Sequence, residues 1–167
     1  MNVRKQFKSD KPILDPCCGS KMFYFNKNNP HVLFCDNRTI NTTLCDGRNL
    51  VVAPDIVADF TQLPFEDNSF WHIVFDPPHI QKAGNLSWLV KKYGKLPIDW
   101  KTYIKQGFDE CWRVLKPNGT LIFKWMEQDI TVSEIIKTIE RQPVYGHRVG
   151  RLNKTHWMAF VKVVSHE

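Results

Sequence analysis

Four short apolar segments of this 167-residue chain each carry an aspartate at or near their end. Bulky and β-branched residues bounded by turn formers are typical of buried strands, so each segment is predicted to be a strand. The segments and their acids are 12–15 with Asp15, 31–35 with Asp36, 55–60 with Asp59, and 71–75 with Asp76. Open α/β sheets bind ligands at the carboxyl ends of their parallel strands. These acids are therefore candidates for a ligand site.

Helical patterns alternate with the predicted strands. The predicted helices span residues 21–25, 103–115 and 131 to about 141. Thr131 and Glu134 have the spacing of a capping box, which marks the start of the last of these helices. Three further strands are predicted at 120–125, 144–149 and 157–164. The alternation predicts a single α/β domain over residues 1–167, with a mostly parallel seven-stranded sheet and helices on both faces.

Composition restricts the classes of protein to which the chain can belong. Hydrophobic residues make up 43% and charged residues 24%, which is ordinary for a globular domain. No run of eighteen apolar residues occurs, so no membrane-spanning segment is expected. Residues 1–10 are polar and basic, unlike a secretory signal, and this predicts cytoplasmic localisation. The net charge of +6 favours a negatively charged partner, with nucleic acid first.

The five cysteines indicate free thiols. Their number is odd and two of them, Cys17 and Cys18, are adjacent, which makes a poor disulfide framework. No C-x-x-C pair is present, so no metal site is predicted.

The first two predicted strands and the turn between them have the layout of a nucleotide-binding unit. A tight turn with Gly19 follows the first strand, and Asp36 ends the second, where such units place the acid that takes ribose hydroxyls. The turn lacks the three glycines that let a pyrophosphate approach the backbone. A ligand with a ribose but without phosphates is therefore favoured.

The fourth strand ends in Asp76-Pro77-Pro78-His79. Because the two prolines cannot donate ladder hydrogen bonds, the strand must stop there and present a carboxylate, two rigid carbonyl acceptors and an imidazole. The simpler alternative is a strand ended by an ordinary turn.

Residues 80–101 follow directly and show no clear period. They contain the lysines Lys82, Lys91, Lys92 and Lys95 and the aromatic residues Trp88, Tyr93 and Trp100. Loops of this length in compact domains are usually functional, so a substrate-facing loop or a lid is expected, with core packing of its aromatic residues as the alternative.

These motifs together resemble those of class I S-adenosylmethionine-dependent methyltransferases, with a Rossmann-like fold and an antiparallel last strand. Asp15-Pro16-Cys17-Cys18-Gly19 resembles the first motif of that superfamily, although the usual motif has more glycines. Leu63–Phe70 and Arg113–Gly119 resemble stretches common among its small members. The resemblance implies S-adenosylmethionine as cofactor. The implied binding residues are Asp15, Cys17, Gly19, Asp36, Asn37, Asp59 and Phe60.

Asp76-Pro77-Pro78-His79 resembles the (Asn/Asp)-Pro-Pro-aromatic motif of enzymes that methylate exocyclic amino groups of nucleic-acid bases. The resemblance implies that Asp76 and the Pro77 carbonyl accept hydrogen bonds from the two N–H groups of the amine. His79 replaces the usual aromatic residue, and its role is either stacking on a base or general-base catalysis. The implied substrate-binding residues are Pro78, Trp88, Lys91, Lys92, Tyr93 and Lys124.

The expected substrate is a base amino group in RNA or DNA. Lys124 keeps ribose 2′-O methylation as an alternative, because such enzymes use an Asp and a Lys in similar places. The remaining alternatives are a small-molecule or protein methyltransferase and a donor-binding RNA-interaction module without turnover. No separate target-recognition domain fits in this length, so a protein partner for target recognition is a further expectation.

Overall fold

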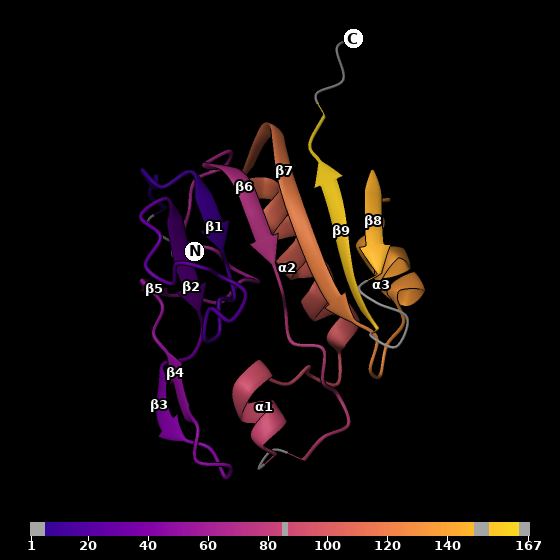
Figure 1. The fold of residues 1–167 in the computed structure, drawn as a ribbon. Coiled ribbons are helices and arrows are strands. Elements are labelled where there is room, and N and C mark those ends of the chain that lie inside the picture. The colour runs from indigo at the N-terminus through magenta and orange to yellow at the C-terminus, as the bar shows by residue number, and fades with distance from the viewer. Residues whose placement is uncertain (1–5, 85–86, 149–153, 164–167) are drawn as a thin grey trace, which may run out of the picture.

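The computed structural model describes residues 6–84, 87–148 and 154–163. A seven-stranded sheet forms the centre of the molecule, with strand order β5-β2-β1-β6-β7-β9-β8 (Figure 1). Its strands are β1 (Ile13–Asp15), β2 (Val32–Asp36), β5 (Ile56–Val57), β6 (Phe70–Phe75), β7 (Leu115–Met126), β8 (Tyr145–Arg148) and β9 (Thr155–Val161). The five neighbouring strands β5, β2, β1, β6 and β7 pair in parallel. Strand β9 runs antiparallel to both β7 and β8. The predicted mostly parallel seven-stranded sheet and its antiparallel last strand are confirmed.

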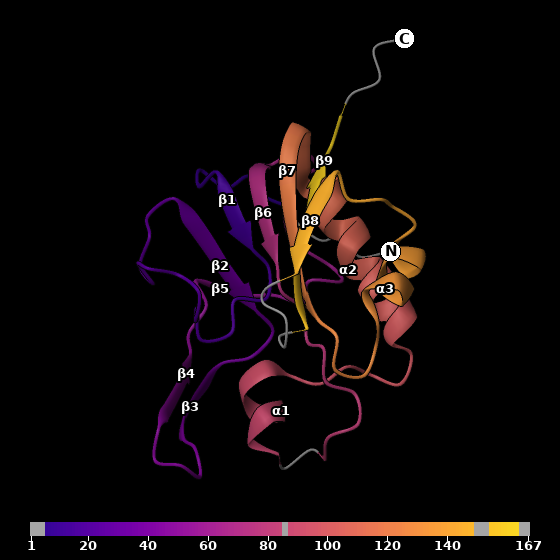
Figure 2. The same cartoon turned by 45° about the vertical axis from the view of Figure 1, so that its right-hand side comes forward.

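Helices α2 (Trp100–Val114) and α3 (Val132–Ile139) cover one face of this sheet (Figure 2). The main core lies between them and alternate residues of β7, where Leu121, Phe123 and Trp125 are fully buried. Asp99 and Thr131 begin the two helices as N-caps, and the predicted capping box of Thr131 with Glu134 is present.

The opposite face carries no helix among the described residues, so the expectation of helices on both faces was only half right. Residues 21–25 form turns instead of the predicted helix. Lys21 has φ +54°, and the Asn26 and Asn29 side chains accept from the backbone N–H groups of Asn28 and His31. Such local hydrogen bonds compete with the helical pattern.

Strand β6, which the sequence analysis predicted to be a buried strand, is buried on one face only. Phe70, Ile73 and Phe75 are fully buried against α2, whereas His72 and Val74 on the other face are half-buried and Trp71 is exposed. Since no helix covers that face, the apolar run alone could not show that burial would be one-sided.

Two small elements lie beyond the carboxyl edge of the sheet, near the strand-end acids (Figure 1). One is an antiparallel hairpin of β3 (Ile40–Thr43) and β4 (Asn49–Val52), which has its own small core and which the sequence analysis missed. Its Asp46-Gly47 turn, with Gly47 at φ +81°, was the available signal. The other is helix α1 (Trp88–Tyr93), capped by Ser87.

Helix α1 gives structure to the segment predicted to be an irregular loop. The Leu96 N–H donates to the Ile80 carbonyl, and both side chains are buried, so the described part of the segment is fixed to the domain at both ends. Trp100, expected in this loop, instead begins α2 and joins the core. Gly94 ends α1 at φ +80°, where a Cβ would come within 2.9 Å of Pro78.

All five cysteines are free thiols, and four of them are at least partly buried. No helix in the described parts of the chain is long and apolar enough to cross a membrane. The described residues contain no group of three or more His, Cys, Asp or Glu side chains that could hold a metal ion.

A close approach between α2 and the strand ends makes Gly107 the most demanding glycine of the fold. A Cβ there would lie 2.5 Å from Phe60 Cδ2 and 3.1 Å from Phe75 Cζ. We expect Gly107→Ala to lower the free energy of unfolding by about 1–2 kcal/mol, because overpacking outweighs the gain in helix propensity. Urea unfolding measures the change. Gln106→Ala, at an exposed neighbouring position, is the control and should be neutral. A Gly107→Ala protein of unchanged or higher stability would contradict this packing.

Candidate functional site

Three aspartates meet at the carboxyl edge of the sheet, because β2, β1 and β6 are neighbours. Asp15 and Asp36 are the last residues of β1 and β2, and Asp76 directly follows β6. Their proximity shows in the pKa of Asp15, which burial, with smaller contributions from the charges of Asp76 and Asp36, raises to about 8. The predicted concentration of carboxylates at one edge is therefore present for three of the four acids.

Asp15 is fully buried at the centre of this cluster. Its Oδ1 accepts from the Cys17 N–H at 3.2 Å and so closes the turn after β1. Oδ2 and the nearby Tyr24 hydroxyl are both buried without a hydrogen bond of normal geometry among the described residues, although the hydroxyl lies close enough to lower the pKa of Asp15. A buried acid with a pKa near 8 is largely protonated at neutral pH.

Asp36 is almost fully buried and has four hydrogen bonds. Its Oδ2 accepts from the Gly19 N–H at 2.9 Å and from Arg38 Nη2 at 3.1 Å. Its Oδ1 accepts from the Arg38 N–H at 3.0 Å and from Arg38 Nε at 2.9 Å. A carboxylate offers about four acceptor positions, so Arg38 and Gly19 together fill them. The sequence analysis missed Arg38, since an arginine two residues after a strand is not by itself a signal.

Asp76 forms an ion pair with Lys124 across the neighbouring strands β6 and β7. Lys124 Nζ lies 2.6 Å from Asp76 Oδ2, and both side chains are about one-fifth to one-quarter exposed. Burial raises the pKa of Asp76, and the Lys124 charge and hydrogen bond oppose that rise. Asp76 Oδ1 has no hydrogen bond to a described residue. The pair therefore leaves one carboxylate oxygen available to a ligand.

Two adjoining cavities connect these groups. The larger, of about 240 Å³, is lined by Cys17, Asp36, Asn37, Arg38, Phe60, Asp76, Pro78, Tyr93, Gly94, Lys95 and Tyr103. The smaller, of about 60 Å³, is lined by Cys17, Cys18, Gly19, Ser20, Met22, Phe23, Arg38, Asp76, Lys92, Tyr93 and Lys124. Arg38 and Asp76 line both cavities. Arg38 Nη1 also donates to the Lys91 carbonyl of α1 at 3.4 Å. Arg38 therefore connects Asp36 to helix α1.

The wall of the larger cavity is aromatic opposite Asp36. Phe60 and Tyr103 have ring centroids 4.6 Å apart, and burial with the neighbouring Asp59 charge raises the pKa of Tyr103. Asp59 itself is exposed and bonds the Thr61 N–H and hydroxyl, so it lies beside the cavity rather than in its lining. Tyr103 is a second lining residue that the sequence analysis placed only within a predicted helix.

His79 lies behind the cavities and lines neither of them. It is 7% exposed, with ring centroids 5.6 Å from Tyr93 and 6.4 Å from Trp125. Burial and, to a smaller extent, the Lys124 charge lower its pKa to about 4. The histidine of the structure is therefore neutral at physiological pH.

The structure distributes the predicted substrate residues unevenly. Pro78, Lys92, Tyr93 and Lys124 line the cavities, and Lys91 contributes its carbonyl to Arg38. Trp88 lines neither cavity and instead lies 5.8 Å from the Arg48 guanidinium of the hairpin turn.

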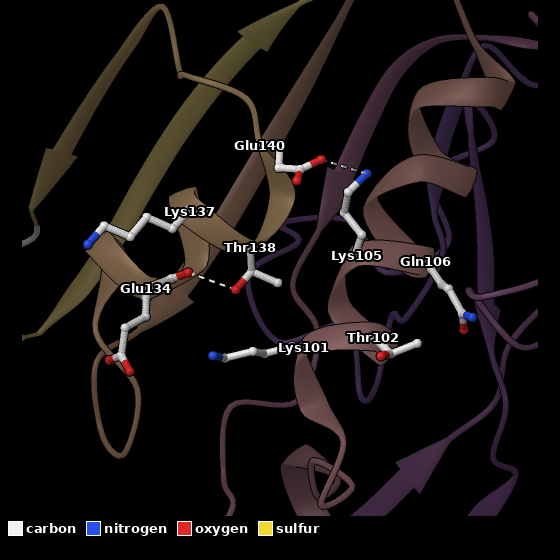
Figure 3. Close-up of a pocket in the computed structure, with 8 residues that line it drawn as sticks. All are labelled: Lys101, Thr102, Lys105, Gln106, Glu134, Lys137, Thr138 and Glu140. Atoms are coloured by element: carbon white, nitrogen blue, oxygen red, sulfur yellow. Dashed lines mark hydrogen bonds and ion pairs between the residues drawn. The ribbon is translucent and has the colours of Figure 1, made fainter.

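A separate groove of about 470 Å³ lies between α2 and α3 (Figure 3) and shares no lining residue with the two cavities. Its lining residues are all polar or charged, and Lys105 there pairs with Asp109 and Glu140. The groove holds none of the strand-end acids, so the cavities at the carboxyl edge are the better candidate site.

Comparison with known proteins identifies the fold. No family model and no curated protein sequence matches the chain. A SAM-dependent methyltransferase from Methanosarcina mazei superposes with a TM-score of 0.55 at 13% identity, over 98% of this chain and 95% of that one. The 1,6-didemethyltoxoflavin-N1-methyltransferase of Burkholderia thailandensis, with bound 1,6-didemethyltoxoflavin and S-adenosylhomocysteine, gives 0.50 at 15% identity, over 91% and 71%.

A third similar structure is a complex between the Haloferax volcanii Trm112 methyltransferase activator and a methyltransferase. It gives a TM-score of 0.53 at 12% identity, over 97% of this chain and 87% of that chain. At these identities the similarity is one of fold. The chain has the α/β Rossmann-like fold of SAM-dependent methyltransferases.

The low pKa of His79 makes stability depend on pH in a defined window. Between pH 6.5 and about 4 the unfolded chain binds a proton at this histidine that the folded protein does not, so stability falls as the pH falls through that window. We expect His79→Phe to remove this part of the acid destabilisation, by about 1–3 kcal/mol between pH 7 and pH 4.5. Urea unfolding at the two pH values measures it.

His31→Gln is the control for this measurement, because His31 is exposed in a turn. An NMR titration of His79 provides an independent reading. A midpoint near pH 6.5 would contradict the buried, neutral ring.

Proposed function

We propose that this protein is a methyltransferase that transfers the methyl group of S-adenosylmethionine to an exocyclic amino group of a base in RNA or DNA. The observation that carries the proposal is the position of Asp76-Pro77-Pro78 at the end of β6, with Asp76 in the wall of a cavity that also contains Asp36.

The cavity residues fit the donor. Asp36 and the Gly19 N–H lie together at the turn after β1, and Phe60 and Tyr103 give the cavity an aromatic lining for an adenine. The single glycine of the turn fits a nucleoside without phosphates. For the ribose hydroxyls to reach Asp36, Arg38 must give up at least part of its bidentate contact. In this proposal Asp15, Cys17, Asn37 and Asp59 shape the same pocket.

The chemistry asks the protein to orient a weak nucleophile. S-adenosylmethionine supplies an electrophilic methyl group, and the amino nitrogen attacks its carbon as the carbon–sulfur bond breaks. Asp76 Oδ1 and the Pro77 carbonyl accept hydrogen bonds from the two N–H groups of the amine and so direct the nitrogen lone pair toward the methyl group. The proton that the methylated nitrogen loses leaves through Asp76, whose pKa is raised by burial. Lys124 holds the carboxylate in place through Oδ2.

His79 is assigned a positioning role in this proposal. Its buried, neutral ring packs on Tyr93, which lines both cavities, and thereby fixes the wall opposite Asp76.

Ribose 2′-O methylation is the second candidate, and the 2.6 Å contact between Lys124 and Asp76 favours it. A paired lysine and aspartate could deprotonate or orient a hydroxyl. Enzymes of that class also use a further lysine and a glutamate. Lys92 is near enough to serve as the former, but no glutamate of the described residues lines either cavity.

The similar structures keep two wider alternatives open. The Burkholderia enzyme holds a small heteroaromatic compound, so a small-molecule acceptor is an alternative to nucleic acid. The Haloferax methyltransferase is complexed with an activator protein, which supports a protein partner for target recognition here.

The proposed function is tested by offering the protein labelled S-adenosylmethionine with separate pools of RNA, DNA and protein. We expect label in one nucleic-acid pool. Digestion to nucleosides then assigns the methyl group to a base or to a ribose. Label in protein alone, or in none of the pools, would overturn the nucleic-acid assignment.

Asp76 should separate chemistry from donor binding. We expect Asp76→Ala to retain donor binding and to lower kcat by a hundredfold or more, because the amino group loses its acceptor. Lys124→Met should lower kcat less, since the carboxylate remains. Single-turnover kinetics and donor calorimetry measure the two effects. A large loss of kcat in Lys124→Met together with a small loss of kcat in Asp76→Asn would instead support 2′-O methylation.

Arg38 should compete with the donor for Asp36. We expect Arg38→Ala to tighten S-adenosylmethionine binding by about fivefold, equivalent to about 1 kcal/mol, because the ribose no longer displaces a charge-assisted pair. Asp36→Ala, in contrast, should weaken donor binding by about 1–3 kcal/mol. Isothermal calorimetry measures both.

The hairpin turn supplies a matched control for this pair. Arg48 contacts Asp46 with the same two-residue spacing, but both residues are exposed, so Arg48→Ala should leave donor affinity unchanged. Weaker donor binding in Arg38→Ala would show that the guanidinium contacts the donor rather than competing with it.

A further inference from the structure

The face of the sheet opposite α2 and α3 is a second surface of interest. No described helix covers it, and a hollow of about 520 Å³ lies on it. The side chains that give the hollow its character are Phe23, Phe25, His72, Val74, Ile122 and Trp157. Its walls come from the turns after β1, and its floor comes from β6, β7 and β9.

The hollow is continuous with the candidate active site. Side chains alternate between the two faces of a strand, so His72, Val74 and Asp76 project on the same side of β6. The register pairs Val74 with Ile122 and Lys124 with Trp157, which places each of these pairs in one row across the sheet. The row next to the hollow therefore contains Asp76 and Lys124. Phe23 lines both the hollow and the smaller cavity at Asp76.

Aromatic rings and a cation lie together where the hollow meets that pair. Phe23 packs edge-on against Trp157, with centroids 5.6 Å apart. Lys124 Nζ lies 5.4 Å from the Phe23 ring centroid and 5.7 Å from that of Trp157. Phe25, at the rim, is fully exposed. An exposed ring at the rim of an aromatic hollow offers a flat face to a planar ligand.

The charge around the hollow selects a polyanion as the occupant. Residues 16–35 contain Lys21 and Lys27 but no acidic residue, and strands β6 to β9 contain no acidic residue either. Asp15 lies beside Tyr24, which also lines the hollow, and keeps its proton at neutral pH, while Asp76 is paired with Lys124. Sequence-tolerant binding of single-stranded nucleic acid combines stacked bases on aromatic side chains with lysines near the backbone. A protein partner would have to bind this surface through apolar contacts alone.

We propose that the open sheet face binds the unpaired nucleotides that flank the target base, with Phe25 as a stacking residue at its rim. This inference rests on the proposed nucleic-acid substrate. The bound nucleic-acid strand runs from Asp76 over Val74 and Ile122 toward His72. At the usual rise of a β-strand, His72 lies about 13 Å from Asp76. The bases lie over Phe25, Phe23 and Trp157, and the phosphates face the acid-free turns that carry Lys21 and Lys27.

The site predicts a preference for single strands. A duplex holds its bases in a stack and cannot present their flat faces to Phe25 or Trp157. Single-stranded RNA and DNA oligonucleotides should therefore bind more tightly than duplexes of the same sequence at the same salt concentration.

Phe25 is the position at which to test the proposal, because a fully exposed side chain can be changed without cost to the core. The probes are fluorescently labelled single-stranded RNA and DNA 12-mers and their duplexes, with binding measured by anisotropy at fixed salt. We expect Phe25→Ala to weaken single-strand binding by about five- to thirtyfold, the loss of about one stacked base. Phe25→Trp should retain binding, and Phe25→Glu should weaken it further.

Val57→Ala and Val57→Glu are the matched controls, since Val57 is exposed on β5 at the far edge of the sheet. Donor affinity should be unchanged in all of these variants. For a methylated nucleic acid, KM should rise in Phe25→Ala and Phe25→Glu while kcat at saturation is retained.

The outcomes separate this proposal from the proposed function. Single-strand binding and KM that respond to Phe25→Glu no more than to Val57→Glu would overturn the sheet-face site and leave the proposed function standing. Equal binding of duplexes and single strands would also overturn it. Single-strand binding that depends on Phe25, in a protein that methylates no nucleic acid, would support this site and overturn the proposed function. A wild-type protein that binds neither RNA nor DNA would overturn both.

Discussion

The burial of three neighbouring carboxylates is the constraint around which the site is built. The strand order β2-β1-β6 brings Asp36, Asp15 and Asp76 to one edge, where burial would penalise three negative charges heavily. Each acid meets this constraint differently. Asp36 pairs with Arg38, Asp76 pairs with Lys124, and Asp15 has a pKa of about 8 and so keeps its proton. The two cations are therefore part of the site as much as the acids are.

The helices on one face and their absence on the other give the two sides of the sheet different roles. Between α2, α3 and the odd-numbered residues of β7, close packing fixes the strands, and Gly107 lets α2 approach Phe60 and Phe75 at the cavity wall. The turns of residues 16–31 cover the other face only in part, which leaves Trp157 and Ile122 half-buried beside Lys124. The core side holds the carboxyl edge rigid, and in our proposal the open side gives single-stranded nucleic acid a route to that edge.

The sequence was sufficient where the physics is local. The apolar runs gave the main strands, the capping box gave the start of α3, and Asp76-Pro77-Pro78 gave the end of β6. It failed where side chains competed with a pattern: the asparagines at 26 and 29 turn the chain where a helix was expected, and Asp46-Gly47 closes a hairpin that was overlooked. Apolar content alone also could not distinguish a strand covered on both faces from β6, which is covered on one.

By itself the sequence determined the α/β class, the parallel sheet, and the acids that end its strands, because strand periodicity and turn chemistry act over a few residues. Only the tertiary structure decided which groups meet. Arg38 reaches Asp36, Lys124 lies 2.6 Å from Asp76, and His79 is buried behind Tyr93 with its pKa lowered to about 4. These outcomes depend on strand order and on the burial that packing imposes, and the free energy of a charge depends on both. Neither quantity is encoded in any single stretch of the chain.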